Sequence, residues 1–318
     1  MDNQVIIPEQ FAFQKGSSTQ SALLSSIDYV INSLDQGKYV AGLFLDLKKA
    51  FDVIDYDILL VKLKHYGVRD LNLRWFESYL SERYQFTVVN GEQSEMKPVT
   101  HGIPQGSILG TLLFLIYVND ITNASDVLKL VLFADDTNAF HSDFDKNNLV
   151  RTLNTELSKI NEWINVNLLT VNLTKTHFLI FSKRNVIQFE GNVMLNNNIV
   201  ERKHETKFLG IIVDEKLKWD NHIQYISTKI SKNIGVIDKM RNALNHETKN
   251  LLYYSLVYPY LHYCSTVWGS ANKTNLNPLT ILQKRIIRII RGTNYRHHTN
   301  ELFKNSKILK LTDIIKLQ

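Results

Sequence analysis

Two short apolar segments that end in carboxylates constrain the fold of this chain more than any other feature. The segment 39–46, YVAGLFLD, is apolar until it ends in Asp46. The segment 130–140, LVLFADDTNAF, places Asp135 and Asp136 between two runs of strand-forming residues. Short apolar runs that end abruptly in charge are typical of strands buried on both faces. We therefore expect both segments to lie in one buried sheet.

Asp135 and Asp136 fit a tight hairpin, which would bring both carboxylates to the exposed tip of buried strands. Turn formation alone would explain the pair, because aspartate favours turns. Phe133 and Ala134, however, are not turn formers, and the strand that ends in Asp46 supplies a third acid. Three clustered carboxylates repel one another and raise their pKa values unless a cation intervenes. Mg²⁺ binds through a few carboxylates and shares substrate phosphates, so the cluster suits a metal site.

The remaining pattern mixes helices and strands, which predicts an α+β fold. Asn90 and Gly91 form a strong hairpin signal, and Ser107 is a good N-cap for the apolar helix that follows it. Other helices are expected over 17–35, 55–83, 145–169 and from 221 onward, and strands over 39–46, 128–134, 137–140, 176–181 and 207–214.

Charge is distributed unevenly along the 318 residues. Beyond position 220 lie 15 of the 37 Lys and Arg residues but only four of the 31 Asp and Glu residues, which gives this segment eleven net positive charges. Residues 1–220 hold 22 basic and 27 acidic residues. The basic segment indicates an anionic partner, either nucleic acid or a membrane surface, although a solvated face has a similar composition.

The segment 279–291 has two chemically different sides when it is drawn as a helix. The apolar side carries Leu279, Leu282, Ile286, Ile289 and Ile290, and the basic side carries Lys284, Arg285, Arg288 and Arg291. Such a helix could lie on an anionic membrane or bind a calmodulin-like partner. Nearby tyrosines, His297 and His298 favour nucleic acid, because aromatic rings stack on bases. Most other aromatic residues, including Trp268, are expected in the core.

Several classes of protein are excluded or disfavoured. Cys264 is the only cysteine, so an intrachain disulfide and a cysteine-rich zinc site cannot form. The first residues lack a signal-peptide pattern, and the longest apolar run, around 112–118, is too short to span a bilayer. We therefore expect an intracellular protein of the nucleus and cytoplasm, with no membrane insertion. His65 and His101 lack ligand spacing and are expected to be structural.

Five segments occur in a specific order along the chain: FLDLKKAFD (44–52), GIPQGSILGTLLF (102–114), FADDTN (133–138), LTVNLTKT (169–176) and KFLGIIVDEKLKW (207–219). This set resembles the reverse transcriptases of LINE-like, non-LTR retrotransposons of the Jockey type. The resemblance runs nearly end to end, from QFAFQKGSSTQSA to LQKRIIRIIRG. Ala12, Gln14 and Thr111 depart from the usual Gly, Arg and Pro of the family, and the first two would weaken fingers contacts with template or triphosphate.

The resemblance implies a right-hand polymerase with partial fingers, a ferredoxin-like palm sheet and a helical thumb. It also implies that the first fingers motifs and the endonuclease of a parent protein are missing from this chain. The implied regions are partial fingers over 1–38, the first acidic palm strand over 39–54, a fingers or palm insertion with a hairpin over 55–100, palm over 101–220 and basic thumb over 221–318.

The resemblance also implies a set of metal ligands and a proton donor. Asp46 and Asp135 are similar to the shared ligands of two Mg²⁺ ions, with Mn²⁺ as an alternative ion. Asp136 would support them, and the Leu47 carbonyl would be a further ligand. Lys175 is similar to a proton donor to pyrophosphate, although a solvated lysine needs no such role.

Nucleotide and primer contacts are implied in the same way. Phe51 is similar to the gate that rejects a ribose 2′-OH, although buried Phe commonly serves core packing. Gln105 and Gly106 resemble the loop that lines the incoming nucleotide. Phe208, Leu209 and Gly210 resemble a primer grip, or form an ordinary strand with a bulge.

The predicted function is that of an RNA-directed DNA polymerase core. A primer 3′-OH would attack the α-phosphate of a dNTP on an RNA template, assisted by two metal ions, in a nucleotidyl transfer. One alternative is a catalytically silent relic that binds RNA through its basic thumb. Another is an RNA-dependent RNA polymerase with the same palm chemistry, against which Phe51 argues.

Overall fold

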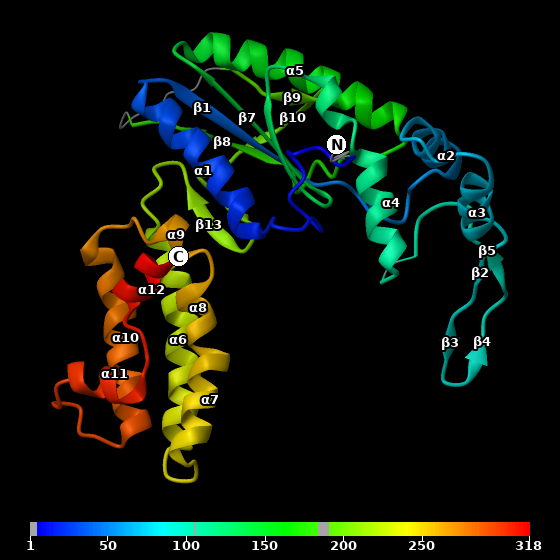
Figure 1. Ribbon diagram of the computed structural model, residues 1–318. Helices are drawn as coiled ribbons and strands as arrows, with labels where there is room; N and C mark the ends of the chain where they lie inside the picture. The colour runs from blue at the N-terminus through cyan, green and yellow to red at the C-terminus, as the bar shows by residue number, and fades with distance from the viewer. Residues whose placement is uncertain (1–4, 105, 184–190) are drawn as a thin grey trace. The chain divides into compact units, whose positions relative to one another are not determined.

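Strand β1 (Tyr39–Leu45) lies at the centre of a five-stranded sheet and buries its whole length. The computed structural model describes residues 5–104, 106–183 and 191–318 (Figure 1). The chain divides into two units, residues 1–203 and 204–318. This division places the segment 204–220 with the C-terminal helices, and the assignment of palm and thumb to these regions remains a prediction.

The sheet of the first unit has the strand order β11-β8-β1-β7-β6. All neighbours are antiparallel except the β11–β8 pair. The order β8-β1-β7-β6, with helices in both crossover connections, is the ferredoxin-like arrangement that the sequence predicted. The other strands are β6 (Lys129–Phe133), β7 (Asp136–Asp143), β8 (His177–Phe181) and β11 (Glu201–Arg202).

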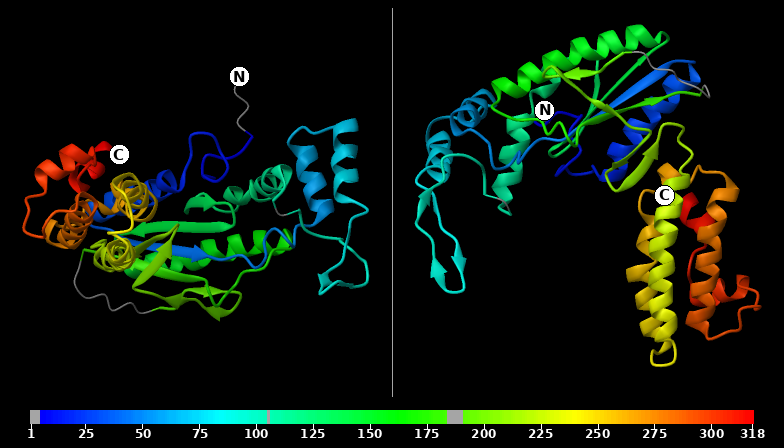
Figure 2. Two further views of the ribbon diagram at one scale, coloured as in Figure 1. Left: turned by 90° about the horizontal axis from the view of Figure 1, so that it is seen from below. Right: turned by 180° about the vertical axis from the view of Figure 1, so that it is seen from behind.

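Helices cover both faces of this sheet, which explains why β1 is buried throughout. Leu43 points to the face covered by α4 (Ile108–Val118) and α5 (Lys146–Val166), where it joins their apolar side chains in one core. Phe44 points to the opposite face, against Phe140. Helix α1 (Thr19–Asp35) closes that face through Tyr29, whose ring lies 6.3 Å from that of Phe140. Figure 2 shows α1 and α5 on opposite sides of the sheet.

Smaller elements complete the first unit. Ser107 accepts a hydrogen bond from the Gly110 N–H at 2.8 Å, which confirms it as the N-cap of α4. The expected hairpin turns at Asn90 and Gly91, both at positive φ. The remaining elements are α2 (Tyr56–His65), α3 (Asp70–Leu80), β2 (Tyr84–Gln85), β3 (Val88–Val89), β4 (Glu92–Gln93), β5 (Lys97–Pro98), a 3-10 helix (Ile121–Ala124), β9 (Met194–Leu195) and β10 (Asn198–Ile199).

The second unit is a short hairpin followed by helices. Its core is built from isoleucines of α6 and α10, and the fully buried Trp268 belongs to it, as predicted. Among the described residues, no helix is both long and apolar enough to cross a membrane. The elements are β12 (Glu205–Phe208), β13 (Ile211–Asp214), α6 (Asp220–Lys239), α7 (His246–Leu256), α8 (Tyr258–His262), α9 (Ser265–Trp268), α10 (Lys273–Arg291), α11 (Asn300–Ser306) and α12 (Leu311–Leu317).

Two expected elements differ in the structure. The helix predicted over 55–83 is broken into α2 and α3, because Gly67 adopts a φ of 94° that ends the first helix. The strand predicted over 207–214 is a hairpin instead. Leu209 and Gly210 adopt φ values of 43° and 84°, so the chain reverses there and β13 pairs with β12.

Candidate active site

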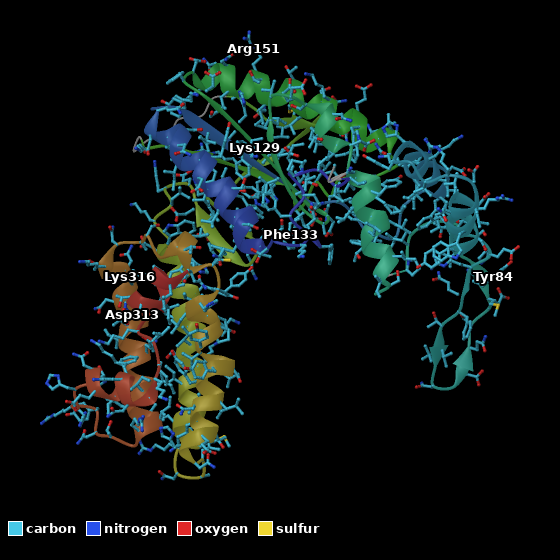
Figure 3. The ribbon with its side chains drawn as sticks, in the orientation of Figure 1. Tyr84, Lys129, Phe133, Arg151, Asp313 and Lys316 are labelled. Atoms are coloured by element: carbon cyan, nitrogen blue, oxygen red, sulfur yellow. The ribbon has the colours of Figure 1, made fainter. Side chains whose placement is uncertain are left out.

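The turn between β6 and β7 presents the two adjacent acids. Phe133 pairs with Asp136 across the hairpin, which leaves Ala134 and Asp135 as the two turn residues. Figure 3 labels Phe133 at the end of β6. Ala134 has a φ of 55°, which is the left-handed conformation that tight hairpin turns require. Both carboxylates are therefore exposed at the tip of buried strands, as the sequence predicted.

The register of β1 and β7 brings the third acid to the same place. Leu45, the last residue of β1, pairs with Thr137 in the antiparallel ladder. Because the ladder is antiparallel, the residue after Leu45 lies opposite the residue before Thr137. Asp46 therefore lies opposite Asp136. The Asp46 N–H also donates to Thr176 Oγ1 at 3.3 Å, which fixes the backbone where the strand ends.

Gln10 holds this turn in place, a role that the sequence did not reveal. Its side chain is buried, and its Oε1 accepts hydrogen bonds from the N–H groups of Ala12 and Ala134, each at 3.0 Å. Backbone bonds from Phe11 to Leu132 and from Leu132 to Glu9 attach the same segment to β6. Nothing in the motif QFAFQKG identifies which glutamine does this, because the contact spans 124 residues of sequence.

The three acids interact electrostatically. Burial, followed by the negative charges of Asp135 and Asp46, raises the pKa of the Asp136 carboxyl. Asp136 still reaches solvent, so water screens part of this repulsion. Within the described residues, no group of three His, Cys, Asp or Glu side chains closes on one point as metal ligands. The carboxylate oxygens are nevertheless the donors that Mg²⁺ and Mn²⁺ prefer, so the chemistry of the set fits these ions.

Lys175 and Leu47 lie beside the acids. Lys175 Nζ is 3.6 Å from Asp46 Oδ2, in the turn that precedes β8. Leu47 pairs with Val171 in an isolated antiparallel bridge, and the Asp46 carbonyl accepts the Asn172 N–H at 2.7 Å. The segment 169–176 therefore lies against the end of β1 and brings a cation to the cluster.

Phe51 stacks on a residue of α4. Its ring centroid lies 4.2 Å from that of Phe114, with an angle of 17° between the ring planes. Phe51 is half-buried, whereas Phe114 is fully buried beneath it. The Phe51 carbonyl accepts the Ile103 N–H at 2.9 Å, so the loop before α4 is attached to the same segment. This position of the Phe51 ring is compatible with core packing and also with contact with a substrate.

The loop before α4 depends on glycine at one position. A side chain at Gly102 would place its Cβ 2.6 Å from the Asp52 carbonyl oxygen, so only glycine fits. Gly106, predicted to line the nucleotide, is exposed, with a φ of 82° and open space around it. Gln105, predicted to line the nucleotide with it, lies outside the described residues.

The predicted primer-grip and thumb residues all belong to the second unit. Phe208 is buried, Gly210 is exposed, and the Leu209 carbonyl accepts the Tyr263 hydroxyl at 2.8 Å. These three residues therefore form a two-residue turn and its flank, rather than a strand with a bulge.

The predicted division of α10 into an apolar side and a basic side is confirmed only in part. Leu279, Ile286 and Ile290 are buried as predicted, Leu282 and Ile289 are only half-buried, and Ile287 is buried instead. Three of the four predicted phosphate contacts already bond within the unit. Arg285 pairs with Asp238, Arg288 with the His297 carbonyl and Arg291 with Ser306, whereas Lys284 is exposed.

The sequence is related to RNA-directed DNA polymerases of mobile elements. The "RNA-directed DNA polymerase from mobile element jockey" of Drosophila melanogaster is 31% identical over 321 residues, which cover 96% of this chain and 34% of that protein. The "Probable RNA-directed DNA polymerase from transposon BS" of the same species is 27% identical over 93% of this chain and 34% of its own length. The chain thus spans about a third of these relatives, and the Jockey-type resemblance is confirmed.

The fold has a solved counterpart. A telomerase from Candida albicans, solved with a TWJ fragment of telomeric RNA, superposes with a TM-score of 0.50 at 14% identity, over 92% of this chain and 53% of that one. This likeness shows the fold alone and confirms the predicted α+β fold. The family model for reverse transcriptase (RNA-dependent DNA polymerase) matches residues 1–213, which hold all three acids. The chain belongs to the reverse transcriptase (RNA-dependent DNA polymerase) family.

Proposed function

We propose that this chain is a polymerase core that extends a DNA primer on an RNA template by nucleotidyl transfer from a dNTP. The observation that carries the proposal is the register of β1 and β7, which sets Asp46 beside the turn of Asp135 and Asp136. An exposed cluster of acids at the end of a buried sheet has no stabilising role, because its members repel one another. It does suit the transfer of a nucleotidyl group from a triphosphate to a hydroxyl, which requires divalent cations.

The metal would be held by Asp46 and Asp135, with Asp136 and the Leu47 carbonyl in support. Two Mg²⁺ ions, or Mn²⁺ in their place, would supply positive charge to the reacting phosphates of an in-line displacement. Membership in the reverse transcriptase family supports the use of such ions.

Other side chains would position substrate and move a proton. The Lys175 ammonium, 3.6 Å from Asp46, is close enough to the acids to donate a proton from Nζ to departing pyrophosphate. Phe51, supported from behind by Phe114, would face the sugar and disfavour a 2′-OH by its bulk. Lys284, Arg285, Arg288 and Arg291 would contact phosphates of the template and primer.

Primer extension tests the proposal. The full chain is incubated with poly(rA)/oligo(dT), dTTP and Mg²⁺, and incorporation is compared with that of Asp135→Ala and of Asp126→Ala, an exposed acid outside the cluster. We expect D135A to lose at least a hundredfold in rate and D126A to match the parent. Equal rates for D135A and the parent would reject the proposal.

Salt-sensitive RNA binding without any incorporation would replace the proposal with the RNA-binding alternative. Incorporation of UTP at least as fast as dTTP would assign the chain to the RNA polymerases instead.

A further inference from the structure

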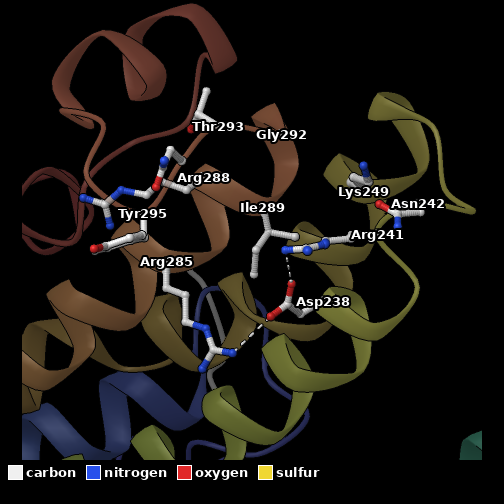
Figure 4. A pocket seen from close by; sticks show the side chains of 11 residues that line it. Asp238, Arg241, Asn242, Lys249, Arg285, Arg288, Ile289, Gly292, Thr293 and Tyr295 are labelled. Carbon is white, nitrogen blue, oxygen red and sulfur yellow. Dashed lines mark hydrogen bonds and ion pairs between the residues drawn. The ribbon is translucent and has the colours of Figure 1, made fainter.

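A basic pocket lies at the end of the second unit where α6 ends, α7 begins and α10 ends (Figure 4). It encloses about 550 Å³. Its charged lining is Arg241, Lys249, Arg285 and Arg288, with Asp238 as the single acid. The four cations come from α7, from α10 and from the connection between α6 and α7, so folding of the whole unit is needed to bring them together.

Asp238 orients two of these cations. Its Oδ1 lies 3.4 Å from Arg241 Nη1 and its Oδ2 lies 3.2 Å from Arg285 Nη2, so one carboxylate is shared by two guanidinium groups. Figure 4 shows both contacts on one side of the pocket. A carboxylate shared in this way neutralises only one of the two charges. The two guanidinium groups are therefore held in place, and one net positive charge remains on them.

Arg288 is fixed by a different contact. Its Nε donates to the His297 carbonyl at 3.0 Å. A guanidinium has five N–H donors, so this single bond leaves most of them for another acceptor. Lys249, half-buried on the first turn of α7, adds a fourth cation to the lining.

The charge balance of the pocket favours an anion. Four cations against one carboxylate leave three net positive charges. The C-terminal ends of α6 and α10 each contribute about −0.5 charge, and the N-terminal end of α7 contributes about +0.5. These partial charges are too small to offset the side chains, so the pocket stays strongly positive.

Two polar features suit a nucleotide rather than a bare ion. Tyr295 lines the pocket and is 70% exposed. The Arg296 guanidinium lies 5.3 Å from the centroid of its ring, so a base would stack on the ring face that Arg296 does not cover. Thr293 Oγ1, in the same lining, is buried and makes no hydrogen bond among the described residues. A hydroxyl in that position can donate to a phosphate or a sugar oxygen.

We propose that this pocket binds single-stranded nucleic acid, with one or two backbone phosphates among Arg241, Lys249 and Arg288 and a base stacked on Tyr295. The site extends the proposed polymerase function, because it adds a template-binding surface that includes Arg241 and Lys249, which lie outside the basic side of α10. It does not depend on nucleotide incorporation.

Binding of a fluorescent ten-nucleotide oligo(rU), measured by anisotropy, tests the site in the full chain carrying Asp135→Ala. That background keeps this test separate from the polymerase proposal, because binding is measured without catalysis. The double variant Arg241→Gln/Lys249→Gln should bind about tenfold more weakly. The slope of the logarithm of its binding constant against the logarithm of the salt concentration should be smaller in magnitude by about 1.4. Tyr295→Leu should weaken binding by about fivefold or more without changing the slope.

Lys232→Gln is the matched control, because Lys232 is an exposed cation of α6 outside the pocket. It should change the Kd by less than about twofold. Lys249→Gln alone is measured as well, with circular dichroism to verify folding, since this change breaks no ion pair of the described residues. An effect of K249Q and of the double variant no larger than that of K232Q would overturn the proposal. Oligo(dT) of the same length distinguishes DNA from RNA as the bound strand.

Discussion

Lys175 Nζ lies 3.6 Å from Asp46 Oδ2, so an exposed cation lies beside the acid cluster. The lysine side chain is 69% exposed and the aspartate 35% exposed. A pair so open to water contributes at most about 1 kcal/mol to stability. Folding therefore gains little from the position of Lys175, and its role at the acid cluster stays a prediction.

Lys175→Gln should consequently separate activity from stability. We expect the free energy of unfolding to change by less than about 0.5 kcal/mol, because only an exposed pair is lost. The rate of nucleotide incorporation should fall at least tenfold, because a proton donor is removed. Urea unfolding and primer extension measure the two quantities. Lys183→Gln, which breaks another exposed ion pair, with Asp35, should leave incorporation unchanged. An equal loss in both variants would contradict the role of Lys175.

The raised pKa of Asp136 predicts how stability depends on pH. A carboxyl whose folded pKa is above its unfolded value favours folding only while it is protonated. That contribution is fully present below the unfolded pKa and is lost as pH rises through the folded pKa. At neutral pH the ionised Asp136 therefore destabilises the protein, and Asp136→Asn should be more stable than the parent by less than about 1 kcal/mol after solvent screening.

Thermal unfolding in EDTA at pH 7 and pH 3.5 measures this difference. The gain from D136N should be present at pH 7 and shrink as the pH falls toward 3.5, because the Asp136 carboxyl of the parent becomes protonated. Added Mg²⁺ should stabilise the parent more than D136N, because the cation compensates the repulsion. Asp28→Asn, an exposed acid of α1, should show neither effect. A stabilisation of D136N that is independent of pH would disprove the electrostatic explanation.

The parts of the fold set by local pattern were predictable from the sequence. The apolar run that ends in Asp46 is typical of a buried strand, and the alternation around Asn90 and Gly91 favours a turn there. The strand predicted over 207–214 was wrong because Leu209 adopts a left-handed conformation that its side chain does not favour. Glycine at position 210 was the only local indication of that turn.

The acids of the candidate site were predictable because they lie at the ends of strands that the sequence itself indicates. Asp46 and the pair at 135 and 136 were found because each follows an apolar run. Gln10 was missed because its function depends on a contact with Ala134, far away in sequence, and a glutamine near the N-terminus has no pattern that indicates burial. The stacking of Phe114 on Phe51 was missed for the same reason, since no local pattern links the predicted gate residue to a position 63 residues further along the chain.

That stacking predicts how the proposed preference for deoxynucleotides depends on Phe51 and Phe114. Phe51→Val should lower the ratio of kcat/KM for dTTP to that for UTP by roughly tenfold or more, because a bulky group near the sugar is lost. Phe114→Leu should lower the same ratio by a smaller factor, because Phe51 loses the ring that supports it. Phe140→Leu removes an equally buried ring from the opposite face of the sheet and should leave the ratio unchanged. An unchanged ratio in F51V would remove Phe51 from the nucleotide site.

Gln10→Ala should cost both stability and activity, because one buried oxygen serves two backbone donors. Its Oε1 accepts the N–H groups of Ala12 and Ala134, and each donor left unpaired in the interior costs about 1–3 kcal/mol. We expect a total loss of roughly 2–4 kcal/mol in urea unfolding. Gln93→Ala, at an exposed position in β4, should change stability by less than about 0.5 kcal/mol.

The activity of Q10A distinguishes a local from a global effect. Since Ala134 precedes the two acids of the turn, its release should displace Asp135 and lower kcat at temperatures where Q10A is still fully folded. The loss should exceed that of a core variant of similar instability that makes no hydrogen bond to the turn, such as Leu23→Ala in α1. If both variants lose kcat to the same extent when folded, Gln10 supports the unit as a whole, and the turn of Asp135 and Asp136 keeps its geometry without this hydrogen bond.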